Sequence, residues 1–495
     1  MNDVLLLGWA SRDVTAEKPV NLAGQFVMRI TGTVRDPLTV TALAMSAGEG
    51  AAQSLIWVSC DTVGIPAAVL ELSRRKLGEL VKEFPVKNLI LNATHTHTAP
   101  DTAGEWYPPV PEGVLTPGEY VEFLTDRIAQ AAAESWQNRK PGYIAWGMAY
   151  TPIGHGRRTT YFDDLSKRPG FEEMPGTRTE KTASMYGTTR DEKFDCIEGY
   201  VDHSAHFLFT FDGSRQLTGA VINIACTAQE TEQLKETSAD FWEDARKALR
   251  KQYGASLFLL PQTSAAGGLS PRPMVNRKAR QRMLDMKGMS SREEIARLIK
   301  VAFDETLGWA SKEMKDRPVF KHASKIIQLP RRMVTEEEYL SIGRGLAELE
   351  RAPASKAPDA NVRAIEDGVV FARKQRCRRV LRRYEEQERI RTCDMELHVV
   401  RIDDIALATN SFELFGDYGI RIQARSPAMQ TFVVQLCGGG PASYLPTRQA
   451  EAGEGYSACV YCNDVGSDGG DLLVNETLRL IAEMWPSAKQ SPAAQ

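Results

Sequence analysis

The sequence predicts an α/β protein in which mixed sheets are flanked by helices. Short apolar runs of about four to eight residues, which are typical of buried strands, alternate with longer segments whose apolar residues recur at helical spacing. The chain has 495 residues, of which 42% are hydrophobic, so it can bury a large core. Strands that alternate with helices form sheets covered by helices, and this is the basis of the predicted fold class.

Residues 1–330 hold most of these elements and are predicted to form one α/β core. The predicted strands are residues 4–9, 38–45, 55–60, 89–91, 207–211, 220–226 and 257–260. The predicted helices are residues 67–84, 117–136 and 239–253. Residues 155–194 are rich in Thr, Arg, Lys, Asp, Gly and Pro, which predicts a long surface excursion beside the site.

A helical hairpin is predicted over residues 331–390. Thr335 and Glu338 have the spacing of a capping box at a helix start. The apolar residues that follow at the spacing of one helix face are Tyr339, Ile342, Leu346 and Leu349. The second helix of the hairpin is predicted from about residue 361 to residue 388.

Residues 391–486 are predicted to complete the same α/β domain. Strands resume after Glu396, and residues 471–485 have the pattern of a closing helix. Residues 487–495 are predicted to form a disordered tail.

The charge balance gives no reason to expect a nucleic-acid or membrane partner. The formal net charge is −3, and the arginine-rich run 373–383 is followed directly by Glu385 and Glu386, as on a solvated helix face. The N-terminus lacks the basic residues and apolar length of a signal peptide, and no uncharged stretch approaches the ~20 residues of a membrane span. The predicted location is therefore cytoplasmic.

The cysteines also fit a reducing compartment. Eight of them are scattered along the chain, which suits reduced thiols better than a disulfide framework. Cys459 and Cys462 form a C-x-x-C pair, but no second pair follows at zinc-ribbon spacing. A zinc or redox role is therefore not predicted for them.

Two histidines mark the candidate site. Residues 92–100 read Asn-Ala-Thr-His-Thr-His-Thr-Ala-Pro and follow the apolar strand 89–91 directly. Alternate residues of an extended chain point to the same side, so His95 and His97 can face one ion or one substrate. Both lie at the carboxyl end of a strand, where open α/β sheets bind ligands.

Three other loops are predicted to meet these histidines. Residues 260–272 continue a strand into a glycine-containing loop that carries Ser270, where backbone can approach a ligand closely. Glu413 stands where a strand passes into a helix, a place that the helix dipole also favours. Residues 436–447 form a glycine-rich loop with Tyr444 and without the lysine of a Walker phosphate loop.

These motifs together resemble those of the neutral ceramidases, in particular of their N-terminal catalytic domain. Residues 94–100, Thr-His-Thr-His-Thr-Ala-Pro, are similar to the family's T-H-T-H-S-G-P, and residues 267–272, Gly-Gly-Leu-Ser-Pro-Arg, to its G-D-x-S-P. Residues 238–241 are similar to its S-A/G-D-Y, Glu413 to its glutamate, and residues 444–447 lie near its tyrosine loop. The resemblance spans nearly the whole chain and implies the ceramidase-type catalytic fold.

The resemblance implies a zinc amidase. His95 and Glu413 would bind zinc with a second histidine and a tyrosine. The residues that would handle the substrate and the attacking water are His97, Ser270, Arg157 and Tyr444. A further open position on the zinc would hold a water whose pKa zinc lowers to ~7.

The sequence departs from the family at one zinc ligand. Thr227 stands where the second zinc histidine is expected. The residues that could replace this ligand are Cys226, Gln229, Glu230 and His203, and Cys226 is chemically the best because thiolate binds zinc well. Alternatively, the metal is absent or is a harder ion.

The expected substrate is a small polar or anionic molecule, such as a sugar acid derivative. The signal peptide and C-terminal β-sandwich of secreted family members are absent from the sequence, so membrane ceramide is not the expected substrate. The predicted substrate-binding residues are Arg158, Arg272, Gln229 and Gly268, and Arg157, Arg421 and Arg425 are expected near the same site.

The sequence therefore predicts a metal-dependent hydrolase, with zinc as its cofactor, that cleaves an amide or related bond in a soluble polar substrate. Two alternatives stay open. One is a carbohydrate-active hydrolase or lyase that uses His95 and His97 as acid and base without zinc. The other is a noncatalytic protein that kept the pocket after losing the metal.

Overall fold

Three sheets with the same strand order form the core of the computed structural model, which describes residues 3–50 and 53–485. The first sheet consists of β1 (Leu5–Asp13), β4 (Thr39–Ala47), β5 (Ser54–Cys60) and β6 (Leu89–Ala93), with β7 (Lys140–Pro141) at its edge. The second consists of β8 (Tyr143–Tyr150), β13 (Ser204–Phe211), β14 (Leu217–Ile224) and β15 (Phe258–Thr263). The third consists of β17 (Phe320–Pro330), β18 (Thr392–Ile402), β19 (Ile405–Thr409) and β21 (Gln430–Val434).

In each sheet the first three strands are antiparallel and the last pair is parallel. The parallel pairs are β5–β6, β14–β15 and β19–β21. The helices that connect these pairs are α1 (Ala67–Leu80), α3 (Phe241–Tyr253) and α8 (Gly416–Arg425). The loops beyond the carboxyl ends of the parallel strands are the places where an α/β sheet binds ligands.

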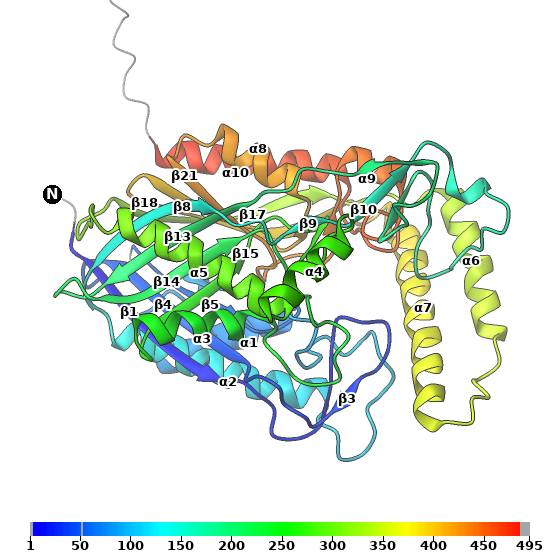
Figure 1. Cartoon of the computed structure of the whole chain (residues 1–495), viewed down its shortest axis with the longest axis horizontal. Helices are drawn as coiled ribbons and strands as arrows, with labels where there is room; N and C mark the ends of the chain where they lie inside the picture. The colour runs from blue at the N-terminus through cyan, green and yellow to red at the C-terminus, as the bar shows by residue number, and fades with distance from the viewer. Residues whose placement is uncertain (1–2, 51–52, 486–495) are drawn as a thin grey trace, which may run out of the picture.

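A shared apolar core lies between the sheets, and helices cover their outer faces. The shared core includes Leu43 of the first sheet, Leu208 of the second and Leu407 of the third. Helices α1 and α2 (Pro117–Gln137) cover the first sheet, and α3 and α5 (Ser291–Ala310) cover the second. Helices α8 and α10 (Ser467–Met484) cover the third. Figure 1 shows α8 and α10 along one side of the molecule and α1, α2 and α3 along the opposite side. Strands buried on both faces are nearly continuous apolar runs, which is why the sequence revealed β5 and β6.

The secondary structure agrees closely with the sequence predictions. Every strand and helix predicted within residues 1–330 overlaps an observed element. The helices α6 (Glu336–Arg351) and α7 (Ala360–Glu386) occupy the predicted hairpin and stand at one end of the molecule (Figure 1). The capping box is confirmed, because Glu338 N donates to Thr335 Oγ1 and Thr335 N donates to Glu338 Oε2. The predicted tail, residues 487–495, lies outside the described residues.

The predicted surface excursion over residues 155–194 is wrong in its first part. This part forms β9 (His155–Gly156) and β10 (Arg158–Tyr161), and the latter pairs with β11 (Ala183–Met185) and β12 (Phe194–Ile197). Arg157 and Arg158 are only 2% and 1% exposed. Acceptor groups from distant segments surround both guanidinium groups, and composition alone does not reveal such partners.

The remaining elements are short. They are β2 (Val20–Asn21), β3 (Ile30–Thr31), η1 (Val86–Asn88), η2 (Leu165–Lys167), β16 (Leu269–Ser270), α4 (Arg277–Lys287), β20 (Glu413–Leu414), β22 (Tyr444–Leu445) and α9 (Arg448–Gly453). Strand β16 pairs with β9, and β20 pairs with β22. Within the described ranges, no helix has the length and apolar character that crossing a bilayer requires.

A chain of polar side chains links β17 and β18 to α1. His322 Nε2 lies 3.0 Å from His398 Nδ1, and His398 Nε2 lies 3.0 Å from Glu396 Oε1. Arg74 donates two hydrogen bonds of 2.8 and 2.9 Å to the same carboxylate. Burial and the neighbouring His398 lower the pKa of His322 to about 3. Burial raises the pKa of Glu396, but the hydrogen bonds from His398 and Arg74 outweigh it and lower this pKa to about 2.

We expect acidification to destabilise the fold below about pH 6.5. The folded state keeps His322 neutral down to its pKa of about 3, whereas the unfolded chain takes up this proton near the ordinary histidine pKa of 6.5, so stability falls with pH in this window. Glu396 acts in the same direction, because its stabilisation is present above its unfolded pKa of 4.5 and is lost as the pH falls toward 2. Urea titrations from about pH 7 to about pH 4 should show a contribution from His322 of at most ~3 kcal/mol. His322→Gln should flatten this dependence and the exposed Lys321→Gln should not; an unchanged slope in His322→Gln would contradict the assignment.

Candidate active site

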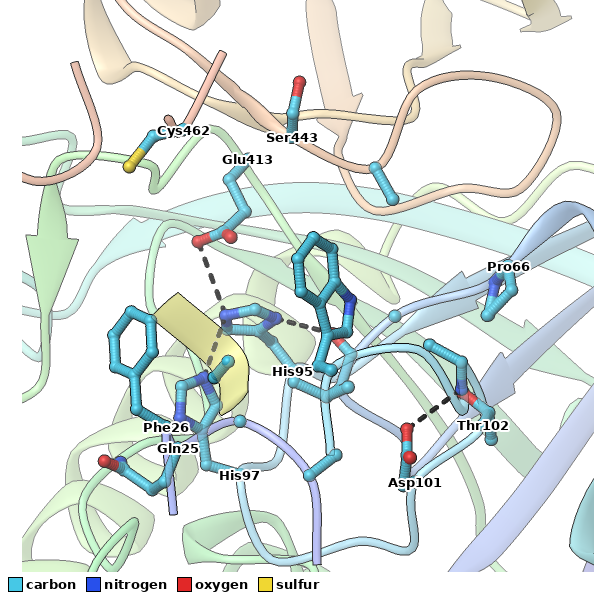
Figure 2. A pocket seen from close by; sticks show the side chains of 18 of the residues that line it. Gln25, Phe26, Pro66, His95, His97, Asp101, Thr102, Glu413, Ser443 and Cys462 are labelled. Carbon is cyan, nitrogen blue, oxygen red and sulfur yellow. Dashed lines mark hydrogen bonds and ion pairs between the residues drawn. The ribbon is translucent and has the colours of Figure 1, made fainter. Parts of the chain in front are cut away.

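Two adjoining cavities lie beyond the carboxyl end of β6; His97 lines both of them, and His95 lines the smaller one. Figure 2 shows the His95 ring between the His97 ring and Glu413, and Glu413 comes from the C-terminal part of the chain. The smaller cavity measures about 250 Å³, and the residues of interest along it are His95, His97, Glu413 and Tyr444. The larger measures about 760 Å³, and its corresponding residues are His97, Arg157, Gln229, Arg272 and Tyr444. His97 and Tyr444 therefore stand where the two cavities meet.

His95 lies two residues beyond the end of β6 in a left-handed backbone conformation, with φ 64°, which is uncommon for a residue other than glycine. Its Nδ1 lies 2.6 Å from the carbonyl oxygen of Val63, so Nδ1 carries the hydrogen and donates it. In the tautomer that this contact favours, Nε2 is an acceptor, and it lies 3.2 Å from His97 Nε2 and 3.4 Å from Glu413 Oε2. The two rings therefore converge, but not by strand alternation, because β6 ends at Ala93 and the left-handed His95 turns the chain between them.

The protonation of His97 follows from the hydrogen bonds of Gln229. Thr227 Oγ1 and Arg157 Nη1 donate to Gln229 Oε1 at 2.6 and 3.3 Å, which identifies that atom as the amide oxygen. Gln229 Nε2 is therefore a donor, and it lies 2.8 Å from His97 Nε2. His97 consequently accepts at Nε2 and carries its hydrogen on Nδ1, which lies 3.5 Å from Glu232 Oε2. Burial, reinforced by the neighbouring positive groups, keeps the pKa of His97 well below its usual value and the ring neutral.

Three acceptor atoms thus face one another: Nε2 of His95, Nε2 of His97 and Oε2 of Glu413. Glu413 Oε2 is buried and has no hydrogen-bond partner among the described residues. Burial raises the pKa of Glu413, but positive charge and a hydrogen bond from a protonated His95, the charge of Arg157 and a hydrogen bond from Tyr444 lower it below its usual value. An ionised Glu413 thus goes together with positive charge beside it. Buried acceptors without donors are costly. His97 Nε2 already accepts from Gln229, so His95 Nε2 and Glu413 Oε2 are the atoms that an added proton on His95 or a cation would stabilise.

Arg157 joins the histidine side of the site to the C-terminal side. Its Nη2 donates to the carbonyl of Gly267 at 3.1 Å and to the hydroxyl of Tyr444 at 3.2 Å, and lies 3.9 Å from Glu413 Oε2. Its backbone N–H donates to the carbonyl of Gly268 at 3.1 Å. Burial and the Glu413 charge raise the pKa of Tyr444 well above its usual value, so its hydroxyl keeps the proton. Arg157 and Tyr444 are both donors at the junction of the cavities.

Two atoms of the acceptor cluster have the spacing of ligands to one cation, but the cluster as a whole does not form a metal site of protein ligands. Ligand atoms around tetrahedral zinc, with bonds of about 2.0–2.1 Å, lie ~3.3 Å apart. The distance of 3.4 Å between His95 Nε2 and Glu413 Oε2 matches this spacing. However, in residues 3–50 and 53–485 no group of three or more His, Cys, Asp or Glu side chains is arranged to hold a metal. A cation here would complete its shell with water or substrate oxygens, as harder ions do.

The prediction of Cys226 as the replacement ligand is not supported by this geometry. Its Sγ donates to the carbonyl of Ile153 at 3.5 Å, and Cys226 lines neither cavity. Burial raises its pKa well above the usual value, so it is a neutral thiol, whereas zinc binds thiolate. Thr227, at the position of the expected histidine, instead donates a hydrogen bond that orients Gln229. Glu230 lines the larger cavity, and His203 lines neither.

The prediction that Arg158 binds substrate is also corrected by the structure. Its Nε donates to Glu198 Oε2 at 2.6 Å, and its Nη atoms donate to the carbonyls of Tyr456 at 3.1 Å and Glu454 at 2.8 Å. Arg158 lines neither cavity. Neighbouring residues of an extended chain point to opposite sides, so Arg157 reaches the site and Arg158 reaches the packing behind it.

Arg421 and Arg425, which were expected near the site, lie on α8 instead. Arg421 Nη1 pairs with Asp471 Oδ1 at 2.6 Å, and Arg425 Nη1 donates to Asn475 Oδ1 at 3.4 Å. Both partners belong to α10, and neither arginine lines a cavity. These side chains join two surface helices.

Ser270 and Gly268 lie in the wall behind the larger cavity. Ser270 pairs with His155 across β16 and β9, and its Oγ accepts a hydrogen bond from the backbone N–H of Arg272 at 3.2 Å. Neither Ser270 nor Gly268 lines a cavity. The wall they form supports Arg157 and Arg272. Direct contact of Ser270 and Gly268 with substrate stays a prediction.

Sequence reasoning missed Glu232 and the residues around it. Glu232 Oε1 pairs with Arg272 Nη1 at 2.9 Å, and Arg29 Nη2 donates to the carbonyl of His97 at 2.6 Å. Gly24 has φ 91°, and a Cβ atom there would lie 2.5 Å from His97 Cγ, so glycine lets this loop approach the ring. The available signal for Glu232 was its place, three residues after Gln229, beyond the carboxyl end of β14.

The comparisons with known proteins identify the fold. No protein-family model matches the chain, and no curated protein sequence matches it significantly. The solved neutral ceramidase from Pseudomonas aeruginosa superposes with a TM-score of 0.63 and 16% identity, over 97% of this chain and 75% of that one. A structure described as ceramidase complexed with C2 gives a TM-score of 0.63 and 15% identity, over 97% and 76% of the two chains. This chain therefore has a neutral-ceramidase-like fold, as its motifs predicted.

Proposed function

We propose that this protein is a hydrolase that cleaves an amide or related bond in a soluble polar or anionic substrate, with a divalent cation bound at His95 and Glu413. The observation that carries the proposal is the set of three converging acceptor atoms beside an arginine-lined cavity. A cation stabilises such acceptors, and arginines attract anionic groups. The ceramidase-like fold supports the hydrolytic reaction class.

His95 Nε2 and Glu413 Oε2 would hold the cation. Bound there, a divalent ion would polarise the scissile carbonyl and lower the pKa of a water molecule. Zinc or a harder divalent ion suits one imidazole and one carboxylate completed by oxygen ligands.

His97 is suited to accept a proton at Nε2. Its ring is neutral, its Nδ1–H faces Glu232 at 3.5 Å, and Arg29 holds its backbone carbonyl. A neutral imidazole oriented by a carboxylate is the usual arrangement of a general base. Gln229, which donates to Nε2 in this structure, would yield that position to a water or substrate hydroxyl.

Tyr444 and Arg157 are suited to stabilise negative charge that develops on the substrate carbonyl oxygen. The hydroxyl keeps its proton, and the guanidinium is held from several sides, so both donors are fixed before substrate binds. Donors fixed in this way, in a site that excludes water, need little reorganisation in the transition state.

The larger cavity favours an anionic substrate. The arginines that line it are Arg157, Arg178, Arg272, Arg277 and Arg280. Within the described ranges, Arg277 and Arg280 form no ion pair with a carboxylate; Arg277 Nε donates to the carbonyl of Pro273, and Arg280 to the hydroxyl of Ser291. These two guanidinium groups therefore retain positive charge for a carboxylate or similar anion of the substrate.

Replacing Arg277 by glutamine is expected to raise KM for an anionic amide about tenfold or more, with kcat nearly unchanged, because a charged hydrogen bond contributes ~1.5–3 kcal/mol. The measurement is steady-state hydrolysis of N-acyl amino acids and N-acylated sugar acids by metal-supplemented protein, alongside neutral amides of the same size. Arg425→Gln, on α8, is the matched control and should leave both constants unchanged.

Three results would decide against parts of this proposal. Efficient cleavage of long-chain ceramide would contradict the polar substrate class. An equal rise in KM for neutral and anionic amides would remove Arg277 from anion binding. Tight binding of an anion without any turnover would favour the noncatalytic alternative.

A metal-free acid–base reaction on a carbohydrate is the second candidate. It is favoured by the distance of 3.2 Å between His95 Nε2 and His97 Nε2, at which one proton can be shared between the rings. Elemental analysis of protein purified without chelators, with assays before and after chelation, distinguishes the two functions. Full activity of metal-free protein would support the second.

A further inference from the structure

Cys459 and Cys462 form a close pair of thiols in the wall of the smaller cavity. Both are free cysteines, and their Sγ atoms lie 3.6 Å apart. Cys462 lines the cavity and is 7% exposed, whereas Cys459 is fully buried behind it. Figure 2 places Cys462 and Glu413 on the same C-terminal side of the cavity. A small oxidant in the cavity therefore meets Cys462 first.

Arg376 of α7 holds the sulfur of Cys462. Its Nη2 lies 3.1 Å from Cys462 Sγ, and its Nε donates to the carbonyl of Gly176 at 2.7 Å. In the part of the chain that the structure describes, Arg376 forms no ion pair with a carboxylate, so this sulfur is the acceptor that can carry its counter-charge. The guanidinium also lies over the rings of Phe26 and Tyr456, 5.2 and 5.6 Å from their centroids.

The pKa values of the two thiols are shifted in opposite directions, as in a redox pair with one attacking and one resolving cysteine. Burial raises the pKa of Cys462, but the hydrogen bond from Cys459 and the charge of Arg376 outweigh it and lower this pKa to about 6. Burial and the neighbouring Cys462 raise the pKa of Cys459 well above its usual value. Cys462 is thus the attacking thiolate and Cys459 the resolving thiol.

We propose that Cys462 and Cys459 are a redox-active pair that a hydroperoxide oxidises to a disulfide, and that this modification displaces Tyr444 at the junction of the two cavities. This activity is separate from the proposed hydrolysis.

The oxidation is balanced with hydrogen peroxide as the oxidant. The Cys462 thiolate attacks one peroxide oxygen, the O–O bond breaks, and the departing hydroxide takes a proton from solvent, leaving a sulfenic acid. Cys459 then loses its proton and its sulfur attacks the Cys462 sulfur; the S–O bond breaks, and the hydroxide leaves with that proton as water. Two cysteines lose two electrons, and the peroxide becomes two waters.

The link to Tyr444 is a set of backbone contacts. Tyr444 N donates to the carbonyl of Cys462 at 3.1 Å, and Asn463 Nδ2 donates to the carbonyl of Tyr444 at 3.2 Å. A disulfide has an S–S length of about 2.05 Å. Closing the gap from 3.6 Å moves the sulfurs together by ~1.5 Å and removes the partner of Arg376. Both changes act on the segment that positions the Tyr444 hydroxyl beside Arg157.

The test is oxidation of the full chain by a few equivalents of hydrogen peroxide, followed by alkylation and peptide mapping. The expected product is one Cys459–Cys462 disulfide, with loss of two of the eight thiols and recovery with dithiothreitol. Cys459→Ser should instead accumulate a sulfenic acid at position 462 that dimedone traps. At about pH 6, Arg376→Gln should slow the oxidation about tenfold, whereas the exposed Arg378→Gln should not.

Oxidation of the exposed Cys196 with no Cys459–Cys462 disulfide would overturn the proposal, as would an unchanged rate in Arg376→Gln. If Arg376→Gln fails to fold, the dimedone result with Cys459→Ser decides. These readouts need no substrate, so they hold whether or not the proposed hydrolysis is correct. Reversible loss of turnover in the wild type, but not in Cys462→Ser, supports displacement of Tyr444; turnover unaffected by the disulfide would overturn that displacement.

Discussion

Replacing His95 by alanine is expected to abolish the binding of one divalent cation per chain and with it most of the turnover. The substitution removes one of the two atoms, 3.4 Å apart, that would bind the ion, and Glu413 alone is a weak site. Loss of several kcal/mol of transition-state stabilisation corresponds to a fall in kcat of about 10²–10⁴. Elemental analysis and titration with zinc and manganese measure the first effect, and steady-state assays measure the second.

Glu413→Gln tests the same site from the opposite side. It keeps the shape of the side chain and removes its charge, so it should weaken cation affinity at least tenfold with little change in the melting temperature. His203→Gln is the matched control, since this histidine lines neither cavity. Metal-free protein with undiminished activity would refute the cation, and unchanged affinity in Glu413→Gln would remove Glu413 from the site.

Arg157 and Arg158 are expected to give opposite phenotypes although they are adjacent and both buried. Arg157→Gln should lower kcat about 10²–10³-fold, because it removes a fixed donor beside Tyr444 and the partner that holds Gln229. Arg158→Gln should instead destabilise the fold by about 3–5 kcal/mol, because it leaves the Glu198 carboxylate buried without its cation. Thermal denaturation and steady-state kinetics on both variants provide the comparison.

The pair is informative because each variant controls for the other. If Arg157→Gln lost only stability, Arg157 would be a structural residue and the role proposed for Tyr444 would lose its support. If Arg158→Gln lowered kcat without affecting the melting temperature, the assignment of the two sides of this strand would be wrong.

The sequence predicted where the site histidines lie but not how they are protonated. Sequence alone located His95 and His97 just beyond a strand end, because the apolar run before them is a local signal. It predicted their convergence from strand alternation, whereas the rings meet through the left-handed backbone of His95. It did not show that His97 is neutral with its hydrogen on Nδ1. That conclusion depends on Gln229, Thr227 and Arg157, which three separate segments bring together.

The sequence also identified some residues of the loops around the histidines and missed the role of others. Glu413 and Tyr444 were singled out from the sequence by the loops that carry them and by the family resemblance, and they meet through the parallel pairing of β20 with β22. Cys462 gave no such signal, since its partner Arg376 lies on a helix 86 residues away along the chain. The pair looked inert in the sequence for that reason.

The sequence by itself determined the strands, the helices and the strand-end histidines, because apolar runs, helical spacing and capping residues act over a few neighbouring positions. Only the tertiary structure decided that three sheets share one strand order, that Arg157 enters the site while Arg158 supports the packing, and that Cys226 stands apart from the acceptor cluster. These outcomes depend on which distant groups surround a buried charge or thiol. Desolvation makes such partners necessary, and the order of residues along the chain does not say which ones they are.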